Sequence, residues 1–233
     1  MFSLPLLLTN PHPCNYLPDR DAQTVFVYPE YPMNNDIYAQ LLTKGFRRSG
    51  DEVYRPQCQN CTACISVRIP IHTFEPNRNQ KRCIKKNQLT RAEIKSATFE
   101  QSHYDLYVKY QHYKHPGGTM GDCSPEDYLR FLGSQWCHSH FIEFSLAGDL
   151  IAVAIVDYFN DALSAVYTFF DPKFNAYSPG VYAVLWQIAQ ARELKLDWLY
   201  LGYWIETCKK MSYKNQYQPL QLFNKGRWQN YIP

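Results

Sequence analysis

Three short apolar segments follow one another closely in the second half of the chain, at residues 140–147, 150–159 and 162–170. Apolar runs of this length, bounded by turn residues, are typical of β-strands. Gly148-Asp149 and Asn160-Asp161 separate the segments and favour tight turns. The pattern therefore predicts an antiparallel meander of three strands.

An alternating run earlier in the chain predicts another strand. Its apolar positions are Ile65, Val67, Ile69 and Ile71, and Ser66, Arg68 and Pro70 lie between them. A period of two places the apolar side chains on one face, so one face of this strand is expected to be buried. Further strands are expected at residues 91–99 and 198–203.

Helix-start signals punctuate the segments between these strands. Asn35 precedes an apolar set that ends at Gly45, and Ser102 has Asp105 three residues later. Ser124 and Ser178 each precede a proline, which suits the first helical position. We expect helices after all four residues, whereas the proline-rich residues 10–34 are expected to be extended and loop-like.

The order of these elements predicts an α+β protein. A meander, a crossover helix and a further strand are similar to the second half of the N-acetyltransferase-like (GNAT) fold, which has a mixed, mostly antiparallel sheet flanked by helices. A boundary near residue 90 would separate a cysteine-containing region, residues 1–90, from the meander-containing residues 91–233.

Composition gives a location but no partner. The net charge of +3 is weak evidence for a polyanionic partner. Residues 1–8 are apolar but lack the basic start of a signal peptide, and no run is long enough to span a membrane. Eight cysteines without a secretory signal indicate a reducing compartment, so a cytoplasmic protein is expected.

Cysteines and arginines gather just before the strand at 65–71. Cys58, Cys61 and Cys64 have spacing that suits zinc or an iron–sulfur cluster, with Cys14 among the candidates for a fourth ligand. Reduced, partly buried thiols are the alternative. Arg47 and Arg48 lie in a predicted turn between two glycines, where one of them is expected to form a structural salt bridge.

Two further stretches are rich in cations. Residues 76–88 predict a short helix with five basic residues on one face and no acidic partners: Arg78, Lys81, Arg82, Lys85 and Lys86. This face would either contact phosphates or be solvated. Residues 200–214 run from a buried strand into a loop that carries Lys209, Lys210 and Lys214, which is a common place for functional groups.

Several long motifs resemble the aminoacyl-tRNA–protein transferases of the N-degron pathway. They are CNYLPDRDA, GFRRSGDEVYRPQC followed by two more cysteines, YTFFDP, YLGYWI and KMSYK. The match covers nearly the whole chain, and its length and cysteine arrangement resemble the short bacterial branch, the aspartate/glutamate leucyltransferases. The resemblance implies transfer of leucine from leucyl-tRNA to proteins with an N-terminal Asp or Glu, which marks them for degradation. It also implies a GNAT-like catalytic fold.

The implied reaction needs no cofactor, because the donor is already an activated ester. An N-terminal amine has a pKa of roughly 7.7–8.0, so positioning and oxyanion donors should matter more than a strong base. Selection of an acidic residue needs a cation, for which arginine is best suited. The candidate catalytic residues are Arg47, Arg48, Tyr203, Glu206, Lys210 and Lys214. The candidate substrate-binding residues are Arg20, Arg55, Tyr167 and Phe169, the last two with Tyr203 as a leucyl pocket.

The five cations of residues 76–88 would then contact the acceptor arm of the tRNA. Some family members carry a cysteine-bound zinc or iron–sulfur centre, and Cys14, Cys58, Cys61 and Cys64 are the residues here that could hold one. Three other functions stay open: an arginyl-tRNA donor, a non-catalytic RNA-binding module with a zinc site, and an acyl-coenzyme A acyltransferase. The oligomeric state cannot be predicted from the sequence.

Overall fold

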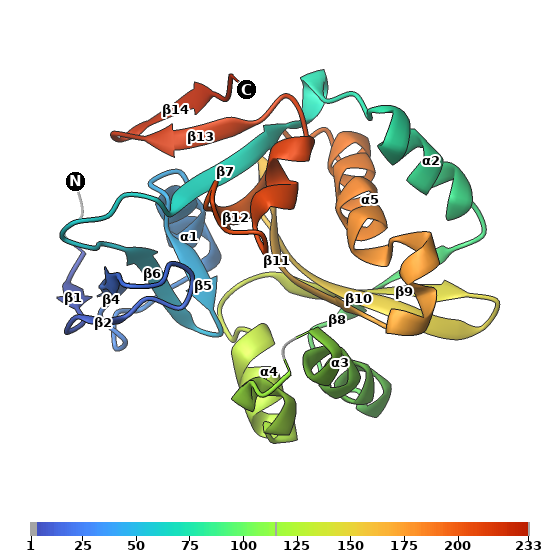
Figure 1. Cartoon of the computed structure of the whole chain (residues 1–233), viewed down its shortest axis with the longest axis horizontal. Coiled ribbons are helices and arrows are strands. Elements are labelled where there is room, and N and C mark those ends of the chain that lie inside the picture. The colour runs from blue at the N-terminus through green and yellow to red at the C-terminus, as the bar shows by residue number, and fades with distance from the viewer. Residues whose placement is uncertain (1–3, 115, 233) are drawn as a thin grey trace.

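The computed structural model describes residues 4–114 and 116–232 of the chain. Among them, one eight-stranded sheet has the order β14-β13-β7-β12-β11-β10-β9-β8, and a four-stranded sheet has the order β1-β4-β6-β5. Strands β2 and β3 pair separately. Figure 1 shows the large sheet at the centre of the molecule, with the small sheet beside it.

The elements have the following bounds. The helices are α1 (Asn35–Leu42), α2 (Arg78–Lys86), α3 (Gln101–Lys114), α4 (Pro125–Leu132) and α5 (Pro179–Glu193), with short 3-10 turns η1 (Ile71–Thr73), η2 (Thr119–Asp122), η3 (Pro172–Tyr177) and η4 (Ser212–Gln216). The strands are β1 (Leu6–Leu8), β2 (His12–Pro13), β3 (Asp21–Ala22), β4 (Thr24–Val27), β5 (Arg47–Ser49), β6 (Glu52–Pro56), β7 (Ile65–Pro70), β8 (Arg91–Ser96), β9 (Ser139–Leu146), β10 (Asp149–Tyr158), β11 (Ala162–Phe170), β12 (Trp198–Trp204), β13 (Gln221–Asn224) and β14 (Arg227–Asn230).

The predicted meander is confirmed as β9, β10 and β11, which pair antiparallel in that order. Helix α5 then crosses over, and β12 pairs parallel to β11. Strand β7 is also confirmed, and Val67, Ile69 and Ile71 are fully buried. The result is a mixed α+β fold in which antiparallel pairs dominate.

Helices cover the large sheet on both faces (Figure 1). On one face, α5 packs against β10 and β11, and α2 packs on α5. Helices α3 and α4 lie on the other face, where Tyr107, Tyr128 and Phe169 form an aromatic core. Because both faces are covered, β10 is buried along nearly its whole length, which accounts for its continuous apolar sequence.

The structure corrects the predicted starts of two helices and the predicted loop at residues 10–34. Asn34, not Asn35, caps α1, because its side chain accepts from the Ile37 amide while Asn35 bonds elsewhere. Helix α3 begins before Ser102, since the Glu100 carbonyl already accepts from the next turn. Residues 10–34 contain β2, β3 and β4 rather than loops alone, because Val25 and Val27 pack into the core under α1.

The expected boundary near residue 90 does not coincide with an edge of the large sheet. Strand β7 lies between β12 and β13 inside that sheet, although it precedes residue 90 in the chain. The division into residues 1–90 and 91–233 stays a prediction about how the chain folds. No helix within the described ranges combines the length and apolarity needed to cross a membrane.

A buried ion pair joins the small sheet to the large one. Arg48 of β5 donates to both carboxylate oxygens of Asp157 on β10, at 2.7 and 2.6 Å, and both side chains are fully buried. Its remaining donors reach Ser139 and the carbonyls of Gly50, Leu132 and Gly133. Each of the three nitrogen atoms of the Arg48 guanidinium therefore has an acceptor. Burial acts to lower the pKa of Arg48, but the charge of Asp157 holds it above its ordinary value.

Breaking this pair should destabilise the fold strongly. We expect Asp157→Asn to lower the free energy of unfolding by about 3–5 kcal/mol, because it leaves a buried guanidinium without its counter-charge. Urea unfolding measures the change. Arg130→Ala, which removes the exposed pair with Asp127, is the control and should cost at most about 1 kcal/mol. Equal effects of the two substitutions would contradict the structural role of the buried pair.

Candidate functional site

Strands β11 and β12 separate soon after they pair. Their parallel register covers only Ala162–Ser164 against Trp198–Tyr200, although β11 continues to Phe170 and β12 to Trp204. Each strand also carries a bulge at this point. The register of β11 with β10 skips Val166, and that of β12 with β7 skips Leu201. Bulges bend strands and are common beside active sites, and we call the part of the sheet where β11 and β12 are no longer paired the opening.

The side chain of Arg47 enters this opening from β5. Its Nη1 donates to Ser164 Oγ at 2.8 Å and its Nη2 donates to the Ala165 carbonyl at 2.6 Å. Ala165 is the first residue of β11 beyond the paired segment. The guanidinium therefore satisfies a carbonyl that lies where the ladder to β12 has ended.

Gly202 of β12 makes room for this guanidinium. Its φ of +81° favours glycine, and a Cβ atom at this position would lie 3.3 Å from Arg47 Nε. A glycine inside a strand pattern often marks a bulge or a close approach. This was the sequence signal for the site, and the sequence analysis did not use it.

The two adjacent arginines are thus in opposite situations. Arg48 is satisfied by Asp157 and four other acceptors, so the expectation that one of the pair is structural is confirmed. Arg47 is 6% exposed and has no carboxylate partner among the residues described. Of the five guanidinium N–H donors, two are used in the bonds above, which leaves three for a ligand.

Tyrosines surround Arg47. Tyr203 donates to the Gly45 carbonyl at 2.9 Å and packs its ring on that of Tyr54 at 6.1 Å between centroids. Burial raises the pKa of both hydroxyls, so both stay neutral. Tyr38 is completely buried, and its hydroxyl has no partner in the described part of the chain, although the charge of Arg47 acts on it. The sequence analysis missed Tyr38, Tyr54 and Ser164.

Lys214 brings a second cation to the same place. It lies in η4, is 9% exposed, and donates from Nζ to the Tyr203 carbonyl at 2.5 Å. Burial, and next the positive charge of Arg47, lower its pKa to about 7. As with Arg47, no carboxylate of residues 4–114 or 116–232 pairs with it. A buried guanidinium without an acid, beside an amine that is only partly protonated near neutral pH, favours an anionic ligand.

The other predicted site residues lie outside this opening or at its margin. Glu206 and Lys210 are exposed in the segment between β12 and η4. Arg55 stacks on Phe46 and donates to the Lys44 carbonyl, whereas Arg20 is exposed and reaches only the Asn60 carbonyl at 3.5 Å. Arg20 does not share the environment of Arg47, whereas the charge of Arg55 reaches the Tyr203 hydroxyl from the margin.

The predicted leucyl pocket is not supported for two of its three residues. Phe169 is fully buried in the aromatic core between the large sheet and α3. Tyr167 lies on the same face and accepts a hydrogen bond from Gln111 of α3. The bulge at Val166 shifts the alternation, so that Ala165 and Tyr167 belong to different cores and both predicted pocket residues face α3.

The predicted basic helix is α2, and its cationic face is confirmed as exposed. Gln80, Cys83 and Asn87 point inward, and a capping box at Asn77 starts the helix. The five cations are exposed, and none has an acidic partner in the described chain: Arg78, Lys81, Arg82, Lys85 and Lys86. Four of them, all but Lys86, border one shallow depression.

The four candidate metal ligands come together from distant parts of the sequence. Cys14 and the loop with Cys58 and Cys61 all lie close enough to Cys64 for their charges to act on it. Burial and then these neighbours raise the pKa of Cys64 to about 12. The donor chemistry thus suits a thiophilic metal. The thiols are not drawn tightly together, because no three of their sulfur atoms lie within 4.8 Å of one another.

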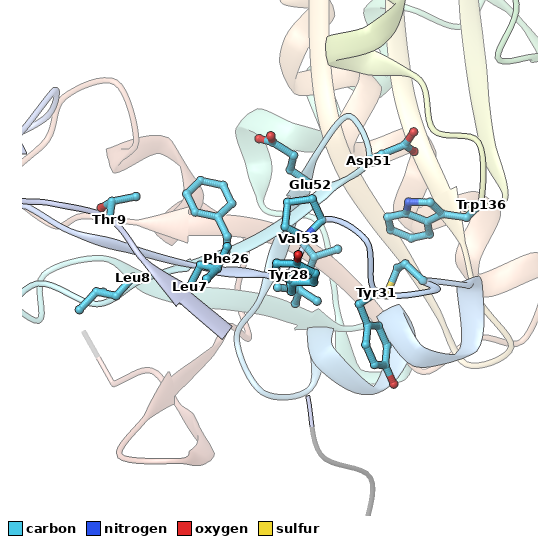
Figure 2. Close-up of a pocket in the computed structure, with 13 residues that line it drawn as sticks. Leu7, Leu8, Thr9, Phe26, Tyr28, Tyr31, Asp51, Glu52, Val53 and Trp136 are labelled. Carbon is cyan, nitrogen blue, oxygen red and sulfur yellow. The ribbon is translucent and has the colours of Figure 1, made fainter. Parts of the chain in front are cut away.

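Two other features do not resemble this opening. Glu100, His103 and Glu143 converge on the far side of the sheet, but Lys95 already pairs with Glu143 at 2.8 Å. A cavity of about 460 Å³ opens beside the small sheet. Figure 2 shows that Leu7, Phe26, Tyr28 and Trp136 line it, with the carboxylates of Asp51 and Glu52 at one side. Its lining has no cation, so it does not suit an acidic ligand.

Comparisons with known proteins match nearly the whole chain. The family model "Arginine-tRNA-protein transferase, N terminus" matches residues 12–82, and "Arginine-tRNA-protein transferase, C terminus" matches residues 102–224. The "Aspartate/glutamate leucyltransferase" of Pseudomonas aeruginosa (strain LESB58) is 48% identical over 220 residues, 94% of each chain. The protein of that name from Saccharophagus degradans is 46% identical over 230 residues, 98% of each chain.

Solved structures show a weaker likeness. The C-terminal domain (DUF2156) of a lysylphosphatidylglycerol synthetase from Agrobacterium fabrum matches with a TM-score of 0.47 and 10% identity, over 74% of this chain and 52% of that one. L-PGS from Bacillus licheniformis matches with a TM-score of 0.43 and 11% identity, over 73% and 50%. Likenesses this low carry no conclusion about the site.

The environment of Lys214 predicts a pH-dependent stability difference. Its folded-state pKa of about 7 lies below the ordinary lysine value of 10.5, so between these values only the unfolded chain holds the proton. Stability from this residue therefore rises as the pH goes from about 7 towards 10. We expect Lys214→Met to be more stabilising at pH 6 than at pH 9, as measured by urea unfolding of both proteins. A pH-independent difference would contradict the lowered pKa.

Proposed function

The chain belongs to the arginine-tRNA-protein transferase family and is an aminoacyltransferase, and we propose that it transfers leucine from leucyl-tRNA to proteins with an N-terminal Asp or Glu. The support for the family is the match over nearly the whole chain. The support for an acidic acceptor is Arg47, a buried guanidinium that has unused donors and no acidic partner among the described residues. The relatives' name supplies leucine as the donor amino acid.

In this proposal, Arg47 binds the carboxylate of the acceptor's first side chain. The guanidinium is held by Ser164 and Ala165, so its remaining donors have a fixed direction. A fixed arginine fork matches a carboxylate with two parallel hydrogen bonds. Asn and Gln at the same position would leave the charge of Arg47 buried and unpaired, so they should be rejected. The buried Tyr38 hydroxyl could add one more donor to the anion.

The reaction itself is an aminolysis of an ester. The α-amine of the acceptor attacks the leucyl carbonyl, a new C–N bond forms, and the bond from that carbon to the ribose oxygen breaks. One proton leaves the amine and one is gained by the ribose oxygen, so no net acid, base, ATP or cofactor is consumed. Arg47 contributes by positioning the amine. Correct positioning of the reactants can account for a large part of the lowering of the barrier in such reactions.

We also propose that the fold is N-acetyltransferase-like. The β9-β10-β11 meander, the α5 crossover and the parallel strand β12 follow the expected order. The separation of β11 from β12 would then admit the reacting ester between two parallel strands. The protein would act in the cytoplasm, where aminoacyl-tRNA is made and where its eight thiols stay reduced.

The tRNA would lie along α2. Its cations are exposed and have no acidic partner within residues 4–114 and 116–232, and α2 packs on α5, which borders β11 and β12. Contacts between these side chains and phosphates would position the acceptor arm without reading its sequence. Donor choice would then depend on the pocket for the aminoacyl group rather than on the helix.

The cysteine group would hold a structural metal. Cys14, Cys58, Cys61 and Cys64 are the proposed ligands, and a bound cation would offset the burial, and next the neighbouring thiols, that raise the pKa of Cys64. Cys64 directly precedes β7, whose Ile65 pairs with Trp204 of β12, so the bound metal would stabilise that end of the opening. It would take no part in the reaction.

Transfer assays test the main proposal. Purified protein should attach leucine from radiolabelled leucyl-tRNA to peptides that begin with Asp or Glu, and at least about 100-fold less to those that begin with Asn or Gln, because one lost charged hydrogen-bond partner costs about 3 kcal/mol. Transfer from arginyl-tRNA instead of leucyl-tRNA would show that the proposed donor is wrong, although the family assignment would still hold. Tight tRNA binding without any transfer would favour the RNA-binding alternative.

Charge reversal on α2 tests the tRNA surface. Lys81→Glu with Lys85→Glu should raise the KM for leucyl-tRNA and leave that for the peptide nearly unchanged. The log–log salt dependence of tRNA binding should flatten by about one unit or slightly less per lost contact. Lys195→Glu with Lys225→Glu is the matched control, since both lysines are exposed in turns. An unchanged salt dependence in the α2 variant would contradict the tRNA contact and would mean that the cationic face of α2 is simply solvated.

Elemental analysis tests the metal proposal. Protein purified without chelator should contain about one equivalent of zinc or a stoichiometric iron–sulfur cluster. Cys61→Ser should then lower the stability by several kcal/mol, because metal binding is linked to folding. Cys123→Ser, outside the group, should have a much smaller effect. Substoichiometric zinc and iron would leave four reduced thiols and overturn the proposal.

A further inference from the structure

The proposed reaction does not yet say which group accepts the proton of the attacking amine. The buried side-chain amine of Lys214 lies beside the opening, where it could accept that proton. Lys214 is held on the edge of the opening between β11 and β12 by a single hydrogen bond, from Nζ to the Tyr203 carbonyl. Tyr203 is near the end of β12, past the residues that pair with β11. The Nζ atom is therefore anchored beside the opening, with the rest of its bonding capacity unused within residues 4–114 and 116–232.

The groups around Lys214 favour an uncharged amine. Arg47 of β5 places a positive charge near it, and no Asp or Glu side chain of the described residues pairs with either cation. Cys208, which follows β12, is the neighbour that acts in the opposite direction. The Tyr213 ring is 5.9 Å from Nζ, and the Tyr203 hydroxyl is engaged by the Gly45 carbonyl. A neutral amine keeps a lone pair, which an ammonium group lacks.

We propose that Lys214 Nζ accepts the proton of the attacking N-terminal amine. This inference rests on the proposed function, since it concerns the same opening. As the C–N bond forms, the amine nitrogen becomes acidic and gives its proton to Nζ. The ammonium of Lys214 then returns the proton to the ribose oxygen as the ester C–O bond breaks, so the enzyme ends each turnover unchanged.

Binding of the acidic substrate would assist this step. A carboxylate held by Arg47 neutralises the charge that disfavours the protonated form of Lys214. The acidic first residue of the substrate protein would thereby be recognised by Arg47. Its carboxylate would also make Lys214 a stronger base. Selectivity for Asp and Glu should consequently appear in kcat as well as in KM.

Two substitutions separate proton transfer from packing. Lys214→Arg keeps a donor for the Tyr203 carbonyl but stays protonated at every accessible pH. Lys214→Gln keeps a neutral polar group that cannot accept a proton effectively. Both should lower kcat by about 100-fold or more with little change in either KM, since general bases contribute 10²–10⁴-fold. Lys225→Arg, in the exposed β13–β14 turn, is the control and should keep wild-type kcat.

The pH profile gives a readout that a structural role would not move. In the wild type, kcat/KM for the peptide should fall below pH 7 with a slope that approaches two, because the peptide amine and Lys214 must both be neutral. In Lys214→Gln the slope should approach one. A slope of one in the wild type, or kcat within threefold of wild type in Lys214→Arg, would overturn the inference. Failure of the wild type to make any leucyl product in the same assay would instead overturn the proposed function.

Discussion

A guanidinium inside a protein needs acceptors, and the described part of the chain gives Arg47 two of them. Ser164 and Ala165 hold it at the point where β11 and β12 separate, and no described carboxylate compensates its charge. Burial, and next the charge of Arg47, lower the pKa of Lys214, and the same charge acts on the buried hydroxyls of Tyr38, Tyr54 and Tyr203. Burial and the charge of Arg47, which no carboxylate of the described residues pairs with, together set the electrostatic character of the opening.

The adjacent residue shows what a structural arginine looks like in the same strand. Arg48 meets Asp157, Ser139 and three carbonyls, so it connects the small sheet to the meander and has no capacity left for a ligand. The rigid attachment of β5 by Arg48 also fixes the backbone from which Arg47 extends. Stability and recognition are thus assigned to neighbouring residues that alternate between two faces of β5.

Local patterns in the sequence were sufficient for much of the fold. The alternation at Ile65–Ile71, the turn residues of the meander and the one-sided cations of α2 each depend on near neighbours, and each was predicted correctly. The motifs also led to the right family. Helix starts were placed within one or two residues, which is the usual precision of capping signals.

The site depends on contacts that no local pattern contains. Arg47 and Arg48 are identical in type and adjacent, so only the positions of Ser164 and Asp157, more than 100 residues later, distinguish their roles. Phe169 was predicted from its place near the end of a strand, but that strand turns it into the aromatic core under α3, a contact far away in the sequence. Tyr38 and Tyr54 gave no signal, because a buried tyrosine in a core and one beside a ligand have the same sequence context.

The central claim is that Arg47 binds the side-chain carboxylate of the acceptor, and a double-mutant cycle tests it most directly. Wild type and Arg47→Met would each be assayed with peptides that differ only in Glu or Gln at the first position. The account predicts a coupling energy of about 2 kcal/mol or more in kcat/KM, because each change removes one half of the same charged pair. Additive effects, with the Glu peptide still preferred by Arg47→Met, would contradict it.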